Sequence, residues 1–321
     1  MKKNSRIYVA GHRGLVGSAI RRLLQQRGYS DLLLRTHAEL DLTDRDAVRS
    51  FFQQERPEYV FLAAAKVGGI LANDQYPADF IRENLQIQTN VIDESYRNNV
   101  KRLLFLGSSC IYPKLAPQPL KEEYLLTGPL EPTNQPYALA KIAGIEMCWS
   151  YNRQYGTQYI AAMPTNLYGP EDNFDLQSSH VIPALIRKAF EAKLSNDRRL
   201  KVWGSGKPKR EFLFNADLAD ACVYLMALEE HTFARLLTQD TPPLINVGTG
   251  KDLSISELAE LIMKIMDWKC EIEFDTSMQD GTHRKLLDVS KMNMLGWKAV
   301  TDLDAGLRQT ILAVSERFIP Q

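Results

Sequence analysis

A glycine-rich turn near the start of the chain restricts its possible folds more than any other feature. Arg6-Ile7-Tyr8-Val9-Ala10 is a short apolar, β-prone run, and Gly11, Gly14 and Gly17 follow it directly. A helical pattern of apolar side chains begins after the last glycine. Strand, glycine turn and helix in this order form the dinucleotide-binding unit of a parallel sheet, although the spacing here is G-x-x-G-x-x-G rather than G-x-G-x-x-G. The chain start therefore predicts a Rossmann-type fold with a dinucleotide at the helix N-terminus.

The segments that follow alternate between buried strands and amphipathic helices. Repeated strand–helix units predict an α/β fold with a doubly wound parallel sheet. After Pro164 the strands become shorter, which predicts a smaller C-terminal substrate-binding lobe. We expect residues 1–170 to form the dinucleotide-binding Rossmann domain, with returning segments near 212–248, and residues 171–321 to form mainly the second lobe. The expected strands are 59–64, 102–107, 159–163, 201–203, 244–247 and 271–274, and the expected helices are 78–98, 135–155, 181–193, 217–228 and 255–266.

The charge balance argues against nucleic acid or a membrane surface as a partner. Lysine plus arginine equals aspartate plus glutamate, at 39 each, so no net field would attract a polyanion. The four cysteines, at positions 110, 148, 222 and 270, are too widely spaced for a metal pattern or a disulfide framework. No run of about 18 apolar residues is present, and the first five residues lead directly into a strand. These features predict a cytoplasmic protein without a metal site.

Tyr137 and Lys141 lie four residues apart, on one face of an expected helix. An ammonium beside a phenol favours the phenolate and lowers the pKa of the phenol toward neutral pH, so such a tyrosine can give a proton to a developing alkoxide. The same spacing also occurs where a tyrosine simply packs beneath a lysine stem. Ser108 follows an expected strand, where ligands of parallel sheets bind, although serine is also a common turn residue. The three side chains together predict hydride transfer at a carbonyl.

The second expected strand, Leu32-Leu33-Leu34-Arg35-Thr36, ends without the acidic residue that holds the ribose 2′-hydroxyl of NAD. Its end carries Arg35, His37 follows, and Arg13 is available in the glycine turn. Cations suit a 2′-phosphate, so the sequence favours NADP over NAD. The alternative is that Arg35 is only a solvated strand end.

These motifs resemble those of the extended short-chain dehydrogenase/reductase family that acts on nucleotide sugars. The resemblance rests on the glycine triplet, Ser108, the Tyr137/Lys141 pair and Pro164-Thr165-Asn166-Leu167-Tyr168-Gly169-Pro170. Further segments resemble one branch of this family over essentially the whole chain, namely 11–14, 63–70, 107–113, 173–174, 180–185, 203–206, 210–213 and 280–282.

That branch implies two reactions in one site, the 3,5-epimerisation and the NADPH-dependent 4-reduction of GDP-4-keto-6-deoxy-D-mannose to GDP-L-fucose. The 4-keto group acidifies the protons at C3 and C5, a base removes each, and an acid returns each to the opposite face. Cys110 and His180 occupy the positions of this base/acid pair. A thiol of pKa near 8.5 and an imidazole near 6.5 both exchange protons close to neutral pH. Without the resemblance, an inert buried thiol and a helix-capping histidine would explain the two residues as well.

The resemblance also assigns the binding residues. Lys188 and Arg210 match positions at the substrate diphosphate, Trp203 a position near the nucleotide sugar, and Asp280 a position near the guanine. Family members can carry an arginine at the position of His37, so NADP preference is expected to be modest here. The residues expected at the cofactor, from the motifs and the resemblance together, are Gly11, His12, Arg13, Gly14, Leu15, Val16, Gly17, Arg35, Asp41, Leu42, Ala64, Leu106, Gly107, Ser108, Ser109, Tyr137, Lys141, Pro164, Thr165, Asn166, Leu167 and His180.

Two other functions remain open. A nucleotide-sugar 4-epimerase with bound NAD shares the fold and the Ser108/Tyr137/Lys141 set, but it has no need of Cys110 and His180. A non-catalytic NADP-binding regulator would keep the glycine turn and lose the catalytic groups. By resemblance, the helices 78–98 and 135–155 are expected to pair across a homodimer.

Overall fold

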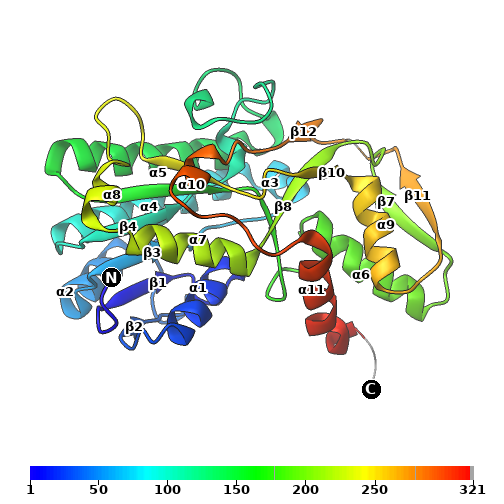
Figure 1. Cartoon of the computed structure of the whole chain (residues 1–321), viewed down its shortest axis with the longest axis horizontal. Coiled ribbons are helices and arrows are strands. Elements are labelled where there is room, and N and C mark those ends of the chain that lie inside the picture. The colour runs from blue at the N-terminus through cyan, green and yellow to red at the C-terminus, as the bar shows by residue number, and fades with distance from the viewer. Residues whose placement is uncertain (177, 279, 319–321) are drawn as a thin grey trace.

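A six-stranded parallel sheet forms the larger part of the protein, to the left in Figure 1. The computed structural model describes residues 1–176, 178–278 and 280–318. The strands of this sheet are β1 (Ile7–Ala10), β2 (Leu32–Leu33), β3 (Tyr59–Leu62), β4 (Arg102–Leu106), β5 (Tyr159–Pro164) and β9 (Leu244–Val247). Their order is β2-β1-β3-β4-β5-β9, so the chain reverses its winding direction between β1 and β3. Every residue of β1, β4 and β5 is buried, as expected for parallel strands that are covered on both faces.

Helices cover both faces of this sheet. Side chains of α2 (Arg45–Glu55), α4 (Pro77–Arg97) and α5 (Gln135–Tyr155) pack on one face, where Tyr8 and Ala10 of β1 also point. Side chains of α1 (Leu15–Gln26), α7 (Asn215–Ala227), α8 (Glu230–Ala234) and α10 (Ser290–Met294) pack on the other face with Ile7 and Val9. Alternate residues of a strand point to opposite faces, which explains this division. The expected doubly wound parallel sheet is thus confirmed.

The second part of the structure, to the right in Figure 1, holds a small mixed sheet and a two-stranded sheet. Strands β6 (Asn166–Tyr168), β8 (Lys209–Phe214), β10 (Asp252–Ser254) and β12 (Arg284–Lys285) form the first, and β7 (Arg199–Trp203) and β11 (Glu271–Asp275) form the second. Helices α6 (Val181–Leu194), α9 (Ile255–Ile265) and α11 (Leu303–Phe318) enclose a separate apolar cluster with Phe212 and Phe214. A short helix, α3 (Ile70–Gln75), lies before α4. The boundaries expected for the two domains remain a prediction.

The structure corrects one expected element. β2 ends at Leu33 rather than at Thr36. The backbone N–H of Thr36 donates to the Glu39 carboxylate at 2.7 Å, so this residue begins a turn instead of extending the strand. Among the helices of the described ranges, none is long and apolar enough to cross a membrane.

Candidate active site

The glycine turn lies where β1 and β3 end side by side, at the point where the winding direction changes. Gly11 has φ +82°, and a Cβ there would lie 2.8 Å from the backbone nitrogen of Ala64. A Cβ on Gly17 would lie 2.1 Å from the carbonyl oxygen of Gly11. By contrast, the nearest atom to a Cβ on Gly14 would be 3.6 Å away, so the space above this residue is open. The fold itself requires glycine at Gly11 and Gly17. At Gly14 only a bound ligand would require it.

The start of α1 fits a bound pyrophosphate. Gly14 is its N-cap and offers no side-chain cap to the first turn, which contains no acidic residue. Uncapped N–H groups and the positive end of the helix dipole favour an anion. The Nδ1 atom of the buried His12 has no hydrogen-bond partner among the described residues. An open cradle and an unpartnered polar atom at this edge fit the dinucleotide expected there.

The cations expected at the ribose phosphate differ in their surroundings. The Arg35 guanidinium donates to the Glu55 carboxylate at 2.5 Å and lies over the Phe51 ring. Arg35 is therefore not simply a solvated strand end. Its guanidinium is paired with a carboxylate that would compete with a phosphate. His37 is exposed and has Nδ1 3.8 Å from the Asp41 carboxylate, whereas Arg13 is exposed at the glycine turn. Arg13 is thus better placed than Arg35 to meet a phosphate.

Several of the other residues expected at the cofactor have defined partners. Asp41 accepts hydrogen bonds from the backbone and hydroxyl of Thr43, which lower the pKa of Asp41. Asn166 and Thr165 both donate to the carbonyl oxygen of Glu211, which fixes the chain after β5. Among the other expected residues, Ala64 follows β3, residues 106–109 lie at the end of β4, and residues 164–167 span the end of β5 and the start of β6. Leu42 is buried in the core.

The structure brings Ser108, Tyr137 and Lys141 together at the carboxyl ends of β4 and β5. Lys141 is buried, and its ammonium donates to the Leu106 carbonyl oxygen at 2.8 Å. The same Nζ atom lies 5.8 Å from the centre of the Tyr137 ring. Tyr137 is half-buried, packs edge-on against Phe80 and hydrogen-bonds with Ser108. The spacing of four residues therefore places both side chains on the same face of α5, as expected.

The pKa directions correct the expectation from the isolated pair. Burial raises the pKa of Tyr137, the charge of Cys110 adds to the rise, and the hydrogen bond with Ser108 opposes it. Burial lowers the pKa of Lys141 to about 7. Desolvation thus acts against the charged form of both groups. The ammonium of Lys141 has a backbone carbonyl as its hydrogen-bond acceptor.

Cys110 lies two residues past Ser108, at the wall of a small recess. Its sulfur accepts from the side-chain amide of Asn134 at 3.2 Å and lies 3.8 Å from the ammonium of Lys285. The thiol is half-exposed, not buried as an inert core cysteine would be. It is also close enough to Tyr137 and Arg210 for its charge to affect their pKa values.

His180 is the N-cap of α6, but its side chain makes no capping hydrogen bond. The ring is exposed, yet it lies among enough protein atoms for burial to lower the pKa of His180. The charge of Lys285 lowers this pKa further. The charge of Lys285 therefore acts on His180, and its ammonium also lies 3.8 Å from the sulfur of Cys110.

The residues expected at the substrate form two neighbouring pairs. The Lys188 ammonium lies 4.6 Å from the centre of the Trp203 ring, and this tryptophan is 47% exposed. The Asp280 carboxylate accepts from the backbone and hydroxyl of Ser205, and the charge of Asp280 acts on Arg210. Burial lowers the pKa of both Lys188 and Arg210.

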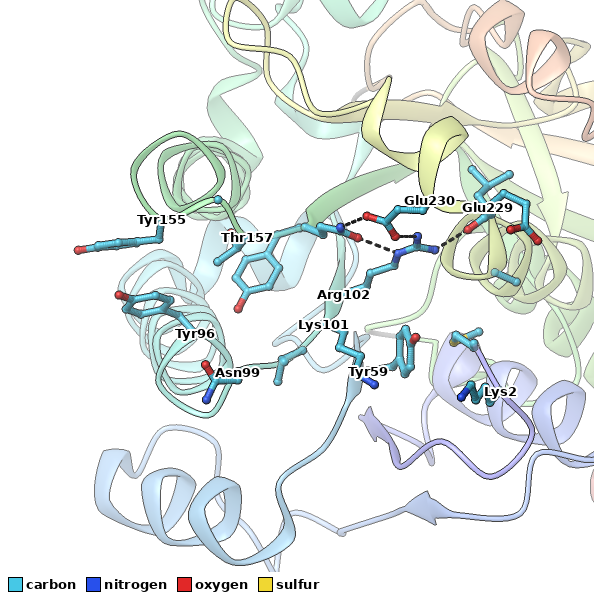
Figure 2. A pocket seen from close by; sticks show the side chains of 17 residues that line it. Lys2, Tyr59, Tyr96, Asn99, Lys101, Arg102, Tyr155, Thr157, Glu229 and Glu230 are labelled. Carbon is cyan, nitrogen blue, oxygen red and sulfur yellow. Dashed lines mark hydrogen bonds and ion pairs between the residues drawn. The ribbon is translucent and has the colours of Figure 1, made fainter.

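A larger depression, of about 670 Å³, lies at the opposite edge of the sheet and is shown in Figure 2. It is lined by the amino ends of β3, β4 and β5 and by Tyr96 and Tyr155. Its buried guanidinium, Arg102, already donates to Gln158, Glu230 and two backbone carbonyls. None of the expected site residues lines this depression. Parallel sheets bind ligands at their carboxyl edge, so we place the active site at the carboxyl edge and not in this depression.

Sequence reasoning missed Lys285, Asn134 and Glu211. The buried Glu211 carboxylate accepts from the backbone N–H groups of Thr249, Gly250 and Leu287 at 2.6, 2.7 and 2.8 Å, and so joins three segments at the site. Only Glu211 gave a sequence signal, as an acidic residue directly before the apolar run Phe212-Leu213-Phe214. Lys285 is 175 positions from Cys110, and no local pattern reveals such a contact.

A parallel sheet with a glycine turn at its switch point defines a dinucleotide-binding protein of the Rossmann class. The chain belongs to the NAD dependent epimerase/dehydratase family, whose model matches residues 7–235. It is 56% identical to GDP-L-fucose synthase of Escherichia coli over 95% of each chain. It is also 56% identical to putative GDP-L-fucose synthase 2 of Arabidopsis thaliana, over 97% of this chain and 92% of that one.

A solved structure agrees with these relatives. GDP-mannoheptose C4 reductase from Campylobacter jejuni, with NADP bound, superimposes with a TM-score of 0.90 at 44% identity and covers 98% of this chain and 99% of that one. The resemblance to the nucleotide-sugar branch that the motifs indicated is thus confirmed over nearly the full length. The family binds a nicotinamide cofactor, and the glycine turn described above fits one.

Proposed function

We propose that this protein converts GDP-4-keto-6-deoxy-D-mannose to GDP-L-fucose, as a 3,5-epimerase and NADPH-dependent 4-reductase. One observation carries the proposal: a half-exposed thiol, Cys110, lies within electrostatic reach of the phenol of Tyr137 at the carboxyl edge of the sheet. A group that moves protons at carbon and a group that moves them at oxygen therefore share one site. The names of the relatives that match over nearly the full length support the same reaction.

Cys110 and His180 serve the epimerisation. The 4-keto group acidifies the C–H bonds at C3 and C5 of the sugar. At each carbon the Cys110 thiolate takes the proton, so that an S–H bond forms and the electron pair passes into the enolate. The protonated His180 then gives its proton to the opposite face of that carbon. Proton exchange with solvent returns both groups to their starting state, and the exposure of His180 allows that exchange.

Tyr137 serves the reduction by giving its proton to the oxygen at C4. Bound NADPH supplies the hydride for that carbon. Ser108 hydrogen-bonds with Tyr137 and would align the carbonyl oxygen, while Lys141 lies behind the ring and holds a positive charge close by whenever it is protonated. Because burial raises the pKa of Tyr137, the tyrosine rests in the protonated form from which it can donate.

The binding roles follow the same division. We place the 2′-phosphate of NADPH at Arg13 and the pyrophosphate at the N-terminus of α1. Lys188 and Arg210 would bind the diphosphate of the substrate, Trp203 would lie near the nucleotide sugar, and Asp280 near the guanine. The exposed Trp203 face and the partly buried cations support these roles. A catalytic thiol must stay reduced, so we also place the protein in the cytosol.

A 4-epimerase with bound NAD would use only the serine, tyrosine and lysine, and a regulator would use neither set. Neither alternative explains why donors converge on the sulfur of Cys110 beside Tyr137.

The test separates the two chemistries. In D2O the wild-type enzyme should place deuterium at C3 and C5 of the product, as seen by NMR. Cys110→Ser should lose this incorporation and still reduce the 4-keto sugar slowly, because a hydroxyl is far too weak an acid to form the needed base at pH 7.

Tyr137→Phe should behave in the opposite way. It should still exchange protons at carbon, bind NADPH, and reduce more slowly by about two to four orders of magnitude, the range expected when general acid catalysis is lost. Normal deuterium incorporation by Cys110→Ser, or turnover of Tyr137→Phe within about threefold of wild type, would contradict the assigned roles.

A further inference from the structure

Two donors converge on the sulfur of Cys110. The side-chain amide of Asn134 lies 3.2 Å from it and the ammonium of Lys285 lies 3.8 Å from it. A neutral thiol needs no such pair, whereas a thiolate is stabilised by both a hydrogen bond and a nearby positive charge. The arrangement thus favours the deprotonated sulfur.

The position of Lys285 is fixed on both sides. It pairs with Arg210 in the parallel ladder of β12 and β8. The preceding residue, Arg284, donates twice to the Asp252 carboxylate, at 2.5 and 3.2 Å. The backbone N–H of Leu287 donates to the buried carboxylate of Glu211. A lysine anchored in this way keeps its ammonium near the sulfur without a partner carboxylate of its own.

Other titratable groups also face the sulfur, and Arg210 among them is a second cation. Tyr137 faces Cys110 from α5 and is neutral at rest, and Arg210 faces it from β8. The recess is also lined by Lys114, Glu131 and Arg284. Lys114 pairs with Glu131 at 3.1 Å, and Arg284 pairs with Asp252. In the part of the chain that the structure describes, Lys285 has no ion pair with a carboxylate.

We propose that Lys285 is a positioning residue that holds Cys110 as a thiolate, ready to remove the protons at carbon. This inference rests on the proposed function for its purpose, but its physical content concerns the free enzyme. The thiol proton passes to solvent when the thiolate forms. The charge of Lys285 also lowers the pKa of His180.

The test measures the thiol itself, without substrate. Purified full-length protein is treated with iodoacetamide over a range of pH, and the alkylation of Cys110 is followed by peptide mass spectrometry, which separates it from the three other cysteines. An opposite charge within a few ångströms lowers a pKa by about 1–3 units. The midpoint of alkylation in Lys285→Met should therefore lie about 1–2 pH units above that of wild type. Lys285→Arg should restore most of the difference.

Matched controls separate charge from structure. Lys298→Met removes the same charge from an exposed position after α10 and should leave the midpoint unchanged. Unchanged NADPH affinity of Lys285→Met shows that the cofactor half is still folded. If that variant binds NADPH normally but keeps the wild-type midpoint, the proposal is wrong, and a raised KM for the GDP-sugar would then assign Lys285 to the substrate phosphates.

The two proposals can fail separately. If the wild-type protein epimerises nothing but Lys285→Met still shows the shifted alkylation midpoint, the role of Lys285 stands and the proposed reaction is wrong. If the wild-type protein epimerises normally but the alkylation midpoint of Lys285→Met is unshifted, the proposed reaction stands and the role of Lys285 is wrong.

Discussion

Lys141 is a lysine whose local environment opposes its charge. It is buried, and the carbonyl oxygen of Leu106 is the acceptor for its ammonium. Burial lowers its pKa to about 7, compared with about 10.4 for a free lysine side chain. Between these values the unfolded chain binds a proton that the folded chain does not, so this group makes the folded state more stable as the pH rises from 7.

The rise of stability with pH gives a prediction for the chain without cofactor. Between pH 7 and 8.5, Lys141 should add about 2 kcal/mol to the free energy of unfolding, from about 1.4 kcal/mol for each pH unit. Above that range the buried thiols Cys148 and Cys222, whose pKa values burial raises, act in the opposite direction. Urea unfolding of wild type and Lys141→Met at each pH measures the difference, and equal slopes for both proteins would contradict the lowered pKa.

Arg13 provides a prediction about cofactor choice. Its side chain is exposed at the glycine turn, whereas Arg35 is engaged by Glu55. Arg13→Ala should therefore weaken NADPH binding more than NADH binding, since only NADPH carries the 2′-phosphate. Arg35→Ala, the matched control, should discriminate less between the two cofactors. Fluorescence titration with both cofactors measures this, and equal losses in Arg13→Ala would remove the arginine from the phosphate site.

At this scale the sequence predicted which side chains meet but not their electrostatics. The spacing of Tyr137 and Lys141 predicted their proximity, because helix geometry is local. The pKa directions depend on how deeply the surrounding chain buries each group, which four residues of sequence do not contain. Lys285 was missed for a related reason, since its contact with Cys110 arises only from the pairing of β12 with β8.

The turn between β1 and α1 gives a prediction at the scale of elements. Gly17→Ala should destabilise the fold by about 1–3 kcal/mol, because its Cβ would lie 2.1 Å from the Gly11 carbonyl oxygen. Gly14→Ala should fold normally, since its φ of −77° suits alanine and its Cβ meets nothing closer than 3.6 Å.

The same alanine at Gly14 should nevertheless weaken cofactor binding by about tenfold or more, a loss of about 1.4 kcal/mol, because it fills the space left for the pyrophosphate. Thermal unfolding and NADPH titration of both variants make the measurement. A destabilised Gly14→Ala, or one with full affinity, would mean that the pyrophosphate lies elsewhere.

Two elements were predicted with their observed bounds. The helix expected at 135–155 and the strand expected at 244–247 have the bounds of α5 and β9. The helices α2, α3, α8, α10 and α11 and the strands β6, β8, β10 and β12 were not predicted. Strands of two to six residues carry little periodicity, and their formation depends on pairing with segments far away in the chain.

For the whole molecule we predict a homodimer formed through α4 and α5. The two helices lie side by side on one face of the sheet (Figure 1). Their outer surface carries the exposed Leu139 and the stacked rings of Tyr96 and Tyr155. Sedimentation should give twice the mass of one chain, 36.5 kDa. Leu139→Arg should shift the protein toward monomer, and Leu312→Arg, an equally polar change on the exposed face of α11, should not.

The fold class was predictable because each βα unit has a sequence pattern that can be recognised within about thirty residues. The hydrogen bonds from residues 249–250 and 287 to Glu211 were not predictable. These segments lie far from Glu211 in the sequence and meet it only in the folded chain.

That buried carboxylate has a further consequence for how the molecule responds to heat. Glu211 accepts hydrogen bonds from the segment that follows the large sheet and from the segment that leaves the small one, while its own strand lies between them. Opening either region would leave an unpaired acceptor in the interior. The two apolar cores should therefore melt as one cooperative unit, and a calorimeter should record a single endotherm instead of two.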